Sequence, residues 1–170
     1  MNRRALLAGL AVPLVGGTAV VAQRFDYRRD KKFSIRTEPP ITGYRFELVD
    51  FDERYASGDM PDDSLSNHAN VEFDSADGRI RVGGRIPSGS RSCMETELRT
   101  VRYVESSDTL IVAVFDDYIH HDTCNLELGP ILYVTDVRFE SSLPSRVVVK
   151  HVTDDDGVVY EKPFSNDNRN

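Results

Sequence analysis

The sequence predicts an all-β fold: a single antiparallel β-sandwich of about eight strands and of immunoglobulin-like size, preceded by an N-terminal signal or anchor segment. Apolar and polar residues alternate with a period of two along most of the chain, which is typical of half-buried strands. Turn-forming sequences such as Asp-Gly separate these stretches at short intervals. After the N-terminal segment, no stretch sustains the 3.6-residue period of an amphipathic helix. The length suffices for one domain rather than two.

The first half of the domain predicts one strand and one hairpin. Residues 43–51 place three apolar side chains on one face: Tyr44, Phe46 and Leu48. Next, an Asp77-Gly78 turn separates two alternating stretches, residues 71–73 and 80–82, which indicates a hairpin. The adjacent Gly83 and Gly84 indicate a bulge or a close approach of another group to the backbone.

A second hairpin is expected over residues 93–118, with its turn at Ser106-Ser107-Asp108. The apolar alternation of its first strand shifts phase near Thr100-Val101, as a β-bulge would cause. Its return strand, residues 110–115, is apolar on both faces, which indicates a central strand.

The C-terminal part predicts one more strand and a third hairpin. Apolar or small residues alternate along the strand at Ile131, Tyr133, Thr135, Val137 and Phe139. The hairpin covers residues 145–164 and turns at Asp156-Gly157. We therefore expect the sandwich domain at residues 43–164, a linker or loosely docked arm at 23–42, and a disordered tail at 165–170.

Residues 1–22 have the pattern of a secretory signal. A basic start precedes an uncharged apolar run, residues 5–22, which ends in small residues that predict cleavage after Ala22. Arg3-Arg4 and the apolar residues after them resemble the twin-arginine export signal, although Asn2 stands where that motif usually has Ser or Thr. The alternative is an uncleaved membrane anchor, because a basic cluster follows at residues 24–32. We therefore expect the protein outside the cytoplasm, either secreted or anchored at the cell surface.

The charge balance limits the partners. The chain has 28 Asp plus Glu against 21 Lys plus Arg, a net charge of −7. Such a surface repels phosphate backbones, so nucleic acid is not an expected partner. Abundant carboxylates and only four lysines resemble proteins from extreme halophiles. Membrane contact is expected only through residues 5–22, if they are retained.

Cys93 and Cys124 are the only cysteines. In an exported protein, two cysteines on neighbouring strands or loops usually form a disulfide, which we predict here. The bridge would close a loop of about 32 residues and contribute about 3–4 kcal/mol in the chain-entropy model.

Two stretches between Ser92 and His151 stand out together, "SCMETELRTVRYVESSDTLIVAV" and "CNLELGPILYVTDVRFESSLPSRVVVKH". They resemble small, uncharacterised exported proteins of haloarchaea. Their shared pattern is mostly structural: two cysteines, a strand ending in Tyr, an apolar strand, and a Leu-Pro-x-x-Val-x-Val-x-His end. The resemblance implies export, the disulfide and an all-β fold, and it implies no activity.

The candidate chemistry lies in "DDYIHHDTC", residues 116–124, where His120, His121 and Asp122 could ligate a transition metal. Adjacent side chains on a strand point to opposite faces, so a polar loop beside a bridged cysteine is the preferred interpretation. His151 alternates with Val147 and Val149, which favours a buried strand residue over a catalytic base.

The sequence predicts no catalytic residue and no cofactor. It favours an exported, acidic, disulfide-stabilised β-sandwich that acts as a cell-envelope or secreted binding or structural module of unknown ligand. The alternative is a metal-dependent extracytoplasmic enzyme that uses the loop of His120, His121 and Asp122.

Overall fold

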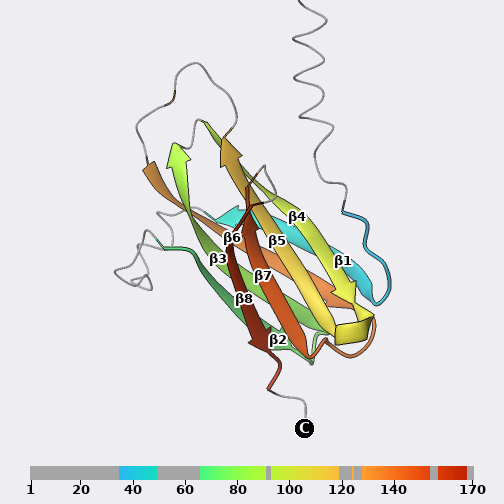
Figure 1. Ribbon diagram of the computed structural model, residues 1–170. Helices are drawn as coiled ribbons and strands as arrows, with labels where there is room; N and C mark the ends of the chain where they lie inside the picture. Colours follow the sequence, from blue (N-terminus) through green and yellow to red (C-terminus); the bar gives the residue numbers. More distant parts are fainter. Residues whose placement is uncertain are drawn as a thin grey trace, which may run out of the picture. The chain divides into compact units, whose positions relative to one another are not determined.

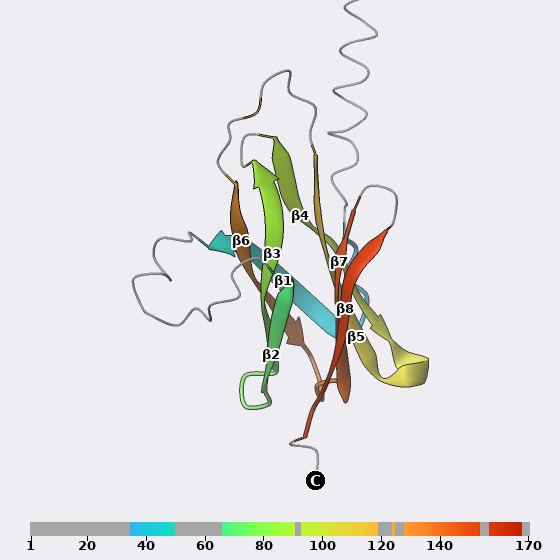
Figure 2. The same cartoon turned by 60° about the vertical axis from the view of Figure 1, so that its left-hand side comes forward.

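The computed structural model describes residues 35–49, 66–90, 93–118, 124, 128–153 and 157–167. These residues form strands in the order β1 (Ile41–Val49), β2 (His68–Asp74), β3 (Arg79–Ser90), β4 (Met94–Val104), β5 (Thr109–Tyr118), β6 (Leu128–Phe139), β7 (Arg146–Val152) and β8 (Val158–Ser165). A short 3₁₀ turn, η1 (Glu105–Ser107), joins β4 and β5. The strands make two four-stranded sheets that pack face to face (Figures 1 and 2), which confirms the all-β sandwich.

The strand order is β1-β6-β3-β2 in the first sheet, here sheet A, and β4-β5-β7-β8 in the second, sheet B. All pairs are antiparallel except β5 and β7, which are parallel. The prediction of a purely antiparallel sandwich is therefore wrong at this pair. The chain leaves sheet B after β5, runs back through sheet A as β6, and returns to sheet B as β7. A parallel pair needs such a crossover, and here a strand of the other sheet supplies it.

The three predicted hairpins are all present. They are the pairs β2–β3, β4–β5 and β7–β8, each antiparallel. The first turn contains Gly78 at a φ of 58°, and η1 is followed by Asp108 at a φ of 45°. Both residues occupy the left-handed region that tight turns use, where glycine and aspartate are favoured. Asp156, predicted for the third turn, lies outside the described residues.

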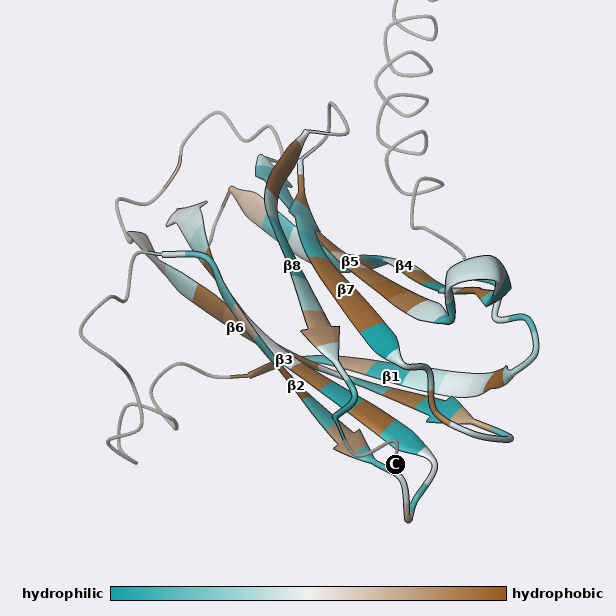
Figure 3. Ribbon diagram, turned by 60° about the horizontal axis from the view of Figure 1, so that its bottom comes forward, coloured by the Kyte–Doolittle hydropathy of each residue, from teal (hydrophilic) through white to brown (hydrophobic). Residues whose placement is uncertain are grey.

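The core lies between the two sheets. The alternation predicted for β6 is correct, because Tyr133, Thr135 and Val137 are all at most 1% exposed. β5 is central, between β4 and β7, as its two apolar faces predicted. Figure 3 shows hydrophobic residues along β3 of sheet A and along β7 of sheet B. Further fully buried core side chains come from both sheets, among them Ile80, Val82, Leu110, Val112, Val114, Val147 and Val149.

The fold extends slightly beyond both predicted domain boundaries. β1 begins at Ile41, which is buried, and Ile35 packs against the core. At the other end, β8 includes Ser165, and the backbone N–H of Asn166 donates to the carbonyl of Ser145 at 2.9 Å. The described residues contain no helix of the length and apolar character that a membrane span requires.

Candidate functional site

The loop that was weighed as a candidate metal site is not part of the described residues. His120, His121 and Asp122 lie outside them, so the preferred interpretation as a polar loop and the metal-dependent alternative both stay hypotheses. Within the described residues, no three or more His, Cys, Asp or Glu side chains gather as metal ligands would.

The disulfide between Cys93 and Cys124 is present, as predicted. The Cα atoms lie 5.6 Å apart, within the range that an S–S bond requires. Cys93 is fully buried just before β4, and Cys124 lies in the connection between β5 and β6. The bridge therefore fastens this connection, which crosses from sheet B to sheet A, to the beginning of β4.

His151 is buried in a chain of hydrogen bonds between the sheets. Its Nδ1 lies 2.7 Å from Oδ1 of Asn67, and its Nε2 lies 2.9 Å from the Tyr133 hydroxyl. The amide oxygen can only accept, so Nδ1 carries the proton and the Tyr133 hydroxyl donates to Nε2. The Tyr160 ring stacks on the imidazole at 4.7 Å between ring centroids. His151 is 0% exposed, which supports the structural interpretation over a catalytic base.

Burial sets the protonation of this cluster. Desolvation lowers the pKa of His151 to about 4, so the ring is neutral at physiological pH. Burial also raises the pKa of Tyr133 well above its ordinary value, which keeps the hydroxyl protonated as the donor. Gly84 makes the arrangement possible, because a Cβ there would lie 2.1 Å from the Tyr133 ring. The close approach predicted at the glycine pair is thus confirmed at Gly84.

A second polar contact joins the sheets at the disulfide end of the sandwich. Asp116 on β5 accepts hydrogen bonds from Thr96 at 2.6 Å and from Ser88 of the opposite sheet at 3.3 Å. Burial raises the pKa of Asp116, although both hydroxyls stabilise its carboxylate. His151 and Asp116, whose pKa values are both shifted by burial, are both engaged inside the sandwich.

The outer faces of the two sheets differ. On sheet A, paired residues form a row of alternating charge across all four strands, Arg45–Asp136–Arg81–Glu72. The side chain of Arg81 contacts Asp136 through two hydrogen bonds of 2.8 and 3.1 Å. This pairing raises the pKa of Arg81 and lowers the pKa of Asp136. The arginines and carboxylates of this row therefore neutralise one another.

The outer face of sheet B has an apolar centre and cations at its margin. One row of paired residues runs Arg102–Ile111–Val148, and the next runs Thr100–Ala113–Lys150–Glu161. Although they face outward, Ala113 and Val148 are only 6% and 9% exposed. Lys150 lies two strands from β4, about 10 Å across the sheet.

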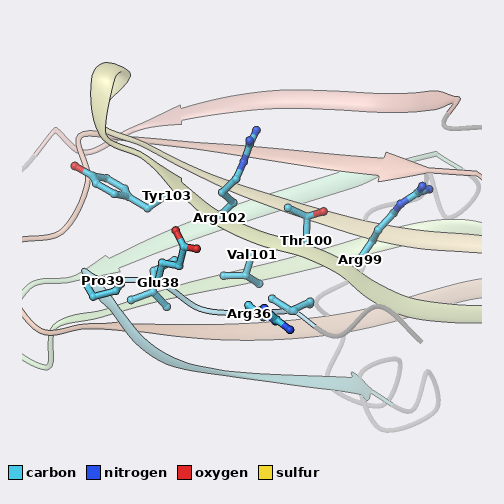
Figure 4. Close-up of a pocket in the computed structure, with 10 residues that line it drawn as sticks. Arg36, Glu38, Pro39, Arg99, Thr100, Val101, Arg102 and Tyr103 are labelled. Carbon is cyan, nitrogen blue, oxygen red and sulfur yellow. The ribbon is translucent and has the colours of Figure 1, made fainter. Parts of the chain in front are cut away.

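A β-bulge in β4 produces this arrangement. The register with β5 slips between Leu98 and Thr100, which leaves Arg99 as the extra residue. The predicted phase shift is therefore confirmed, one residue earlier than expected. Because of it, Leu98 and Val101 both face the core, whereas Arg102 faces outward. Figure 4 shows Arg99 and Arg102 extending to the same side of β4, away from Arg36.

Two shallow hollows adjoin this stretch of β4. One, of about 260 Å³, lies between residues 99–103 and the segment 35–41 that leads into β1 (Figure 4). The other, of about 430 Å³, lies on the outer face of sheet B. We call it the outer hollow; its lining residues are Arg99, Thr100, Arg102, Ile111, Ala113, Lys150 and Val152.

The Arg99 side chain, which lines the outer hollow, is held in place by its contacts. Its guanidinium donates to the carbonyl of Thr153 at 3.2 Å and lies over the Phe115 ring at 6.0 Å from the centroid. Lys150 forms an ion pair with Glu161 at 2.8 Å. Arg102 is exposed, and no carboxylate in the described part of the chain pairs with it. The three cations thus surround an apolar floor.

Sequence reasoning did not single out Arg99, Arg102 or Lys150. The phase shift near Thr100-Val101 was the available signal, since bulges often redirect side chains beside functional sites. The sequence could not have placed Lys150 near the two arginines, because the position of Lys150 depends on the parallel pairing of β5 and β7.

Compared with known proteins, the chain matches no family model, no curated protein and no solved structure.

Proposed function

We propose that this protein is an exported, disulfide-stabilised β-sandwich that acts as a binding or structural module in the cell envelope or the medium. The observation that carries the proposal is the disulfide between Cys93 and Cys124. Disulfides persist in oxidising compartments and are rare in the cytosol. A location outside the cytoplasm also agrees with the signal-like pattern of residues 1–22.

A binding or structural role is supported by how the fold uses its polar groups. His151 and Asp116 have the perturbed pKa values expected of catalytic groups. Their hydrogen bonds, however, are made to residues inside the sandwich and connect the two sheets. Other charges, such as those of Arg81, Asp136 and Glu161, lie on the outer faces, and Arg99, Arg102 and Lys150 line a shallow hollow. A rigid two-sheet scaffold with such faces is suited to presenting a surface to a ligand.

Export is tested by fractionating the native cells and sequencing the mature N-terminus. We expect the protein in the envelope or the medium, either cleaved after Ala22 or retained with residues 5–22 in the membrane. Replacing Arg3 and Arg4 by Lys should stop export by the twin-arginine route; unchanged export would assign the general secretory route. Recovery from the cytosol alone would contradict the proposal.

A further inference from the structure

We infer that the outer hollow of sheet B binds a carboxylated polysaccharide, with Arg99, Arg102 and Lys150 as the cationic contacts. Binding at this site can be measured on purified protein whether or not the protein is exported.

The outer hollow is cationic although the chain as a whole is acidic. The chain carries a net charge of −7, yet the outer hollow has three cationic side chains and no acidic one among the described residues that line it. On the outer face of sheet A, Arg79 and Arg81 form ion pairs with Asp74 and Asp136, which reduces the attraction of these arginines for an anion. Arg102 has no such partner in the described part of the chain, and its planar guanidinium matches a carboxylate.

The floor of the outer hollow is mostly apolar. Ile111, Ala113 and Val152 present methyl groups between the cations, and Thr100 adds a hydroxyl. A sugar ring has an apolar C–H face and a hydroxyl-bearing edge, and a uronate adds a carboxylate. Thr100 and Lys150 stand about 10 Å apart across the sheet, which admits one chain of rings. The volume of about 430 Å³ falls within the range of small-molecule sites.

An acidic peptide fits these features less well. Peptides that bind β-sheets commonly add a strand at a free edge, where the main chain supplies the affinity. The outer hollow instead has a floor of side chains, over β5 and β7 whose two edges are both paired. It is also shallow, without the deep pocket that an anchoring aromatic or arginine side chain of a protein partner would fill.

The site is partly ordered before a ligand arrives. Thr153 and Phe115 fix the Arg99 guanidinium, so little conformational entropy is lost when it contacts an anion. Lys150 is engaged by Glu161, whose side chain is 50% exposed. A bound carboxylate would compete with Glu161 for Lys150, which predicts that removing the Glu161 charge strengthens binding.

The test measures binding of polygalacturonate by isothermal titration calorimetry, at the lowest salt concentration at which circular dichroism shows folded protein. Neutral dextran, dextran sulfate and polyglutamate serve as the comparison polymers. The variants are Arg102→Gln, Glu161→Gln and the control Arg138→Gln. Arg138 is exposed on the outer face of sheet A, so the control changes the net charge equally and leaves the hollow intact.

We expect polygalacturonate to bind and neutral dextran not to bind. Arg102→Gln should weaken binding about tenfold, the loss typical of one charge-assisted hydrogen bond, and Glu161→Gln should strengthen it. Arg138→Gln should have little effect. No binding of polygalacturonate, or equal losses in Arg102→Gln and Arg138→Gln, would overturn the proposal. Tighter binding of polyglutamate or dextran sulfate than of polygalacturonate would also overturn it, by assigning an acidic peptide or a sulfated polymer instead.

Discussion

At the scale of single residues, a hydrogen-bonded chain of Asn67, His151 and Tyr133 links the two sheets. Its members come from three separate parts of the chain, and Asn67 is 84 residues from His151. Both ring nitrogens of His151 and the hydroxyl of Tyr133 have hydrogen-bond partners, which is the condition for burying a histidine and a tyrosine without a large desolvation cost. Alternation in the sequence places Tyr133 and His151 on inner faces. It cannot reveal that they meet, because that depends on how the two sheets are stacked.

The buried histidine predicts a pH-dependent stability. An unfolded His titrates near its ordinary pKa of 6.5, whereas folded His151 titrates at about 4. Between these values the unfolded chain binds a proton that the folded chain does not. The free energy of unfolding should therefore fall by about 3 kcal/mol as the pH decreases from 6.5 to 4. Urea denaturation at several pH values measures the slope.

In His151→Gln this part of the pH dependence should be absent, whereas the exposed-residue control His68→Gln should keep most of it. The raised pKa of Asp116 acts in the opposite direction, because folded Asp116 holds its proton to a higher pH than the unfolded chain. Comparing each variant with the wild type removes that contribution. An identical slope in His151→Gln and the wild type would contradict the prediction.

Gly84 should not tolerate a side chain. A Cβ there would lie 2.1 Å from the Tyr133 ring, which is held by its hydrogen bond to His151. We expect Gly84→Ala to lower the free energy of unfolding by about 3 kcal/mol, the upper end of the usual cost of overpacking. Gly43→Ala is the matched control, since no atom lies within 4 Å of its added Cβ. Equal stabilities of the two variants in urea denaturation would show that the Tyr133 ring moves aside freely.

At the scale of secondary-structure elements, the bulge in β4 determines both the core and the outer hollow. Its phase shift was visible in the sequence, because Leu98 and Val101 cannot share a face in a regular strand. The parallel pairing of β5 and β7 was not visible. Alternation in one strand does not specify its neighbour, and here the neighbour is fixed by a crossover through the other sheet. Hence the hairpins could be predicted, and the position of Lys150 beside β5 could not.

Deleting Arg99 should remove the bulge without reversing the strand. Leu98, Thr100 and Val101 would then alternate regularly and keep their partners on β5. We expect a folded variant that loses only the Arg99 contacts, at a cost of about 1–2 kcal/mol. Deleting Arg81 from β3 is the control. β3 has no bulge there, so the deletion would turn Val82 outward. Thermal denaturation and circular dichroism should show that only the second variant fails to fold. If both fail, the extra residue is not dispensable.

At the scale of the whole molecule, two four-stranded sheets enclose one core, and one disulfide fastens the connection that crosses between them. Composition and alternation were sufficient to predict this fold class. The difference between the outer faces was not predictable, because it arises from cross-strand pairing: rows of ion pairs on sheet A, and an apolar floor with cations on sheet B.

The disulfide should contribute measurably to stability. It spans a sequence separation of 31, for which loop-closure entropy predicts a loss of about 2–4 kcal/mol on reduction. The far-ultraviolet circular dichroism should stay that of a β protein, because the core does not depend on the bridge. Urea denaturation with and without reductant measures the difference. The Cys93→Ser, Cys124→Ser double variant should not respond to reductant. Equal stability of reduced and oxidised wild type would contradict the prediction.

The central claim is that this sandwich works outside the cytoplasm in its disulfide-bonded form. The most direct measurement blocks free thiols in intact native cells, fractionates them, and determines by mass spectrometry the state of Cys93 and Cys124 in each fraction. We expect the protein in the envelope or the medium, with both cysteines joined to each other. Protein found in the cytosol with both thiols blocked would contradict the claim.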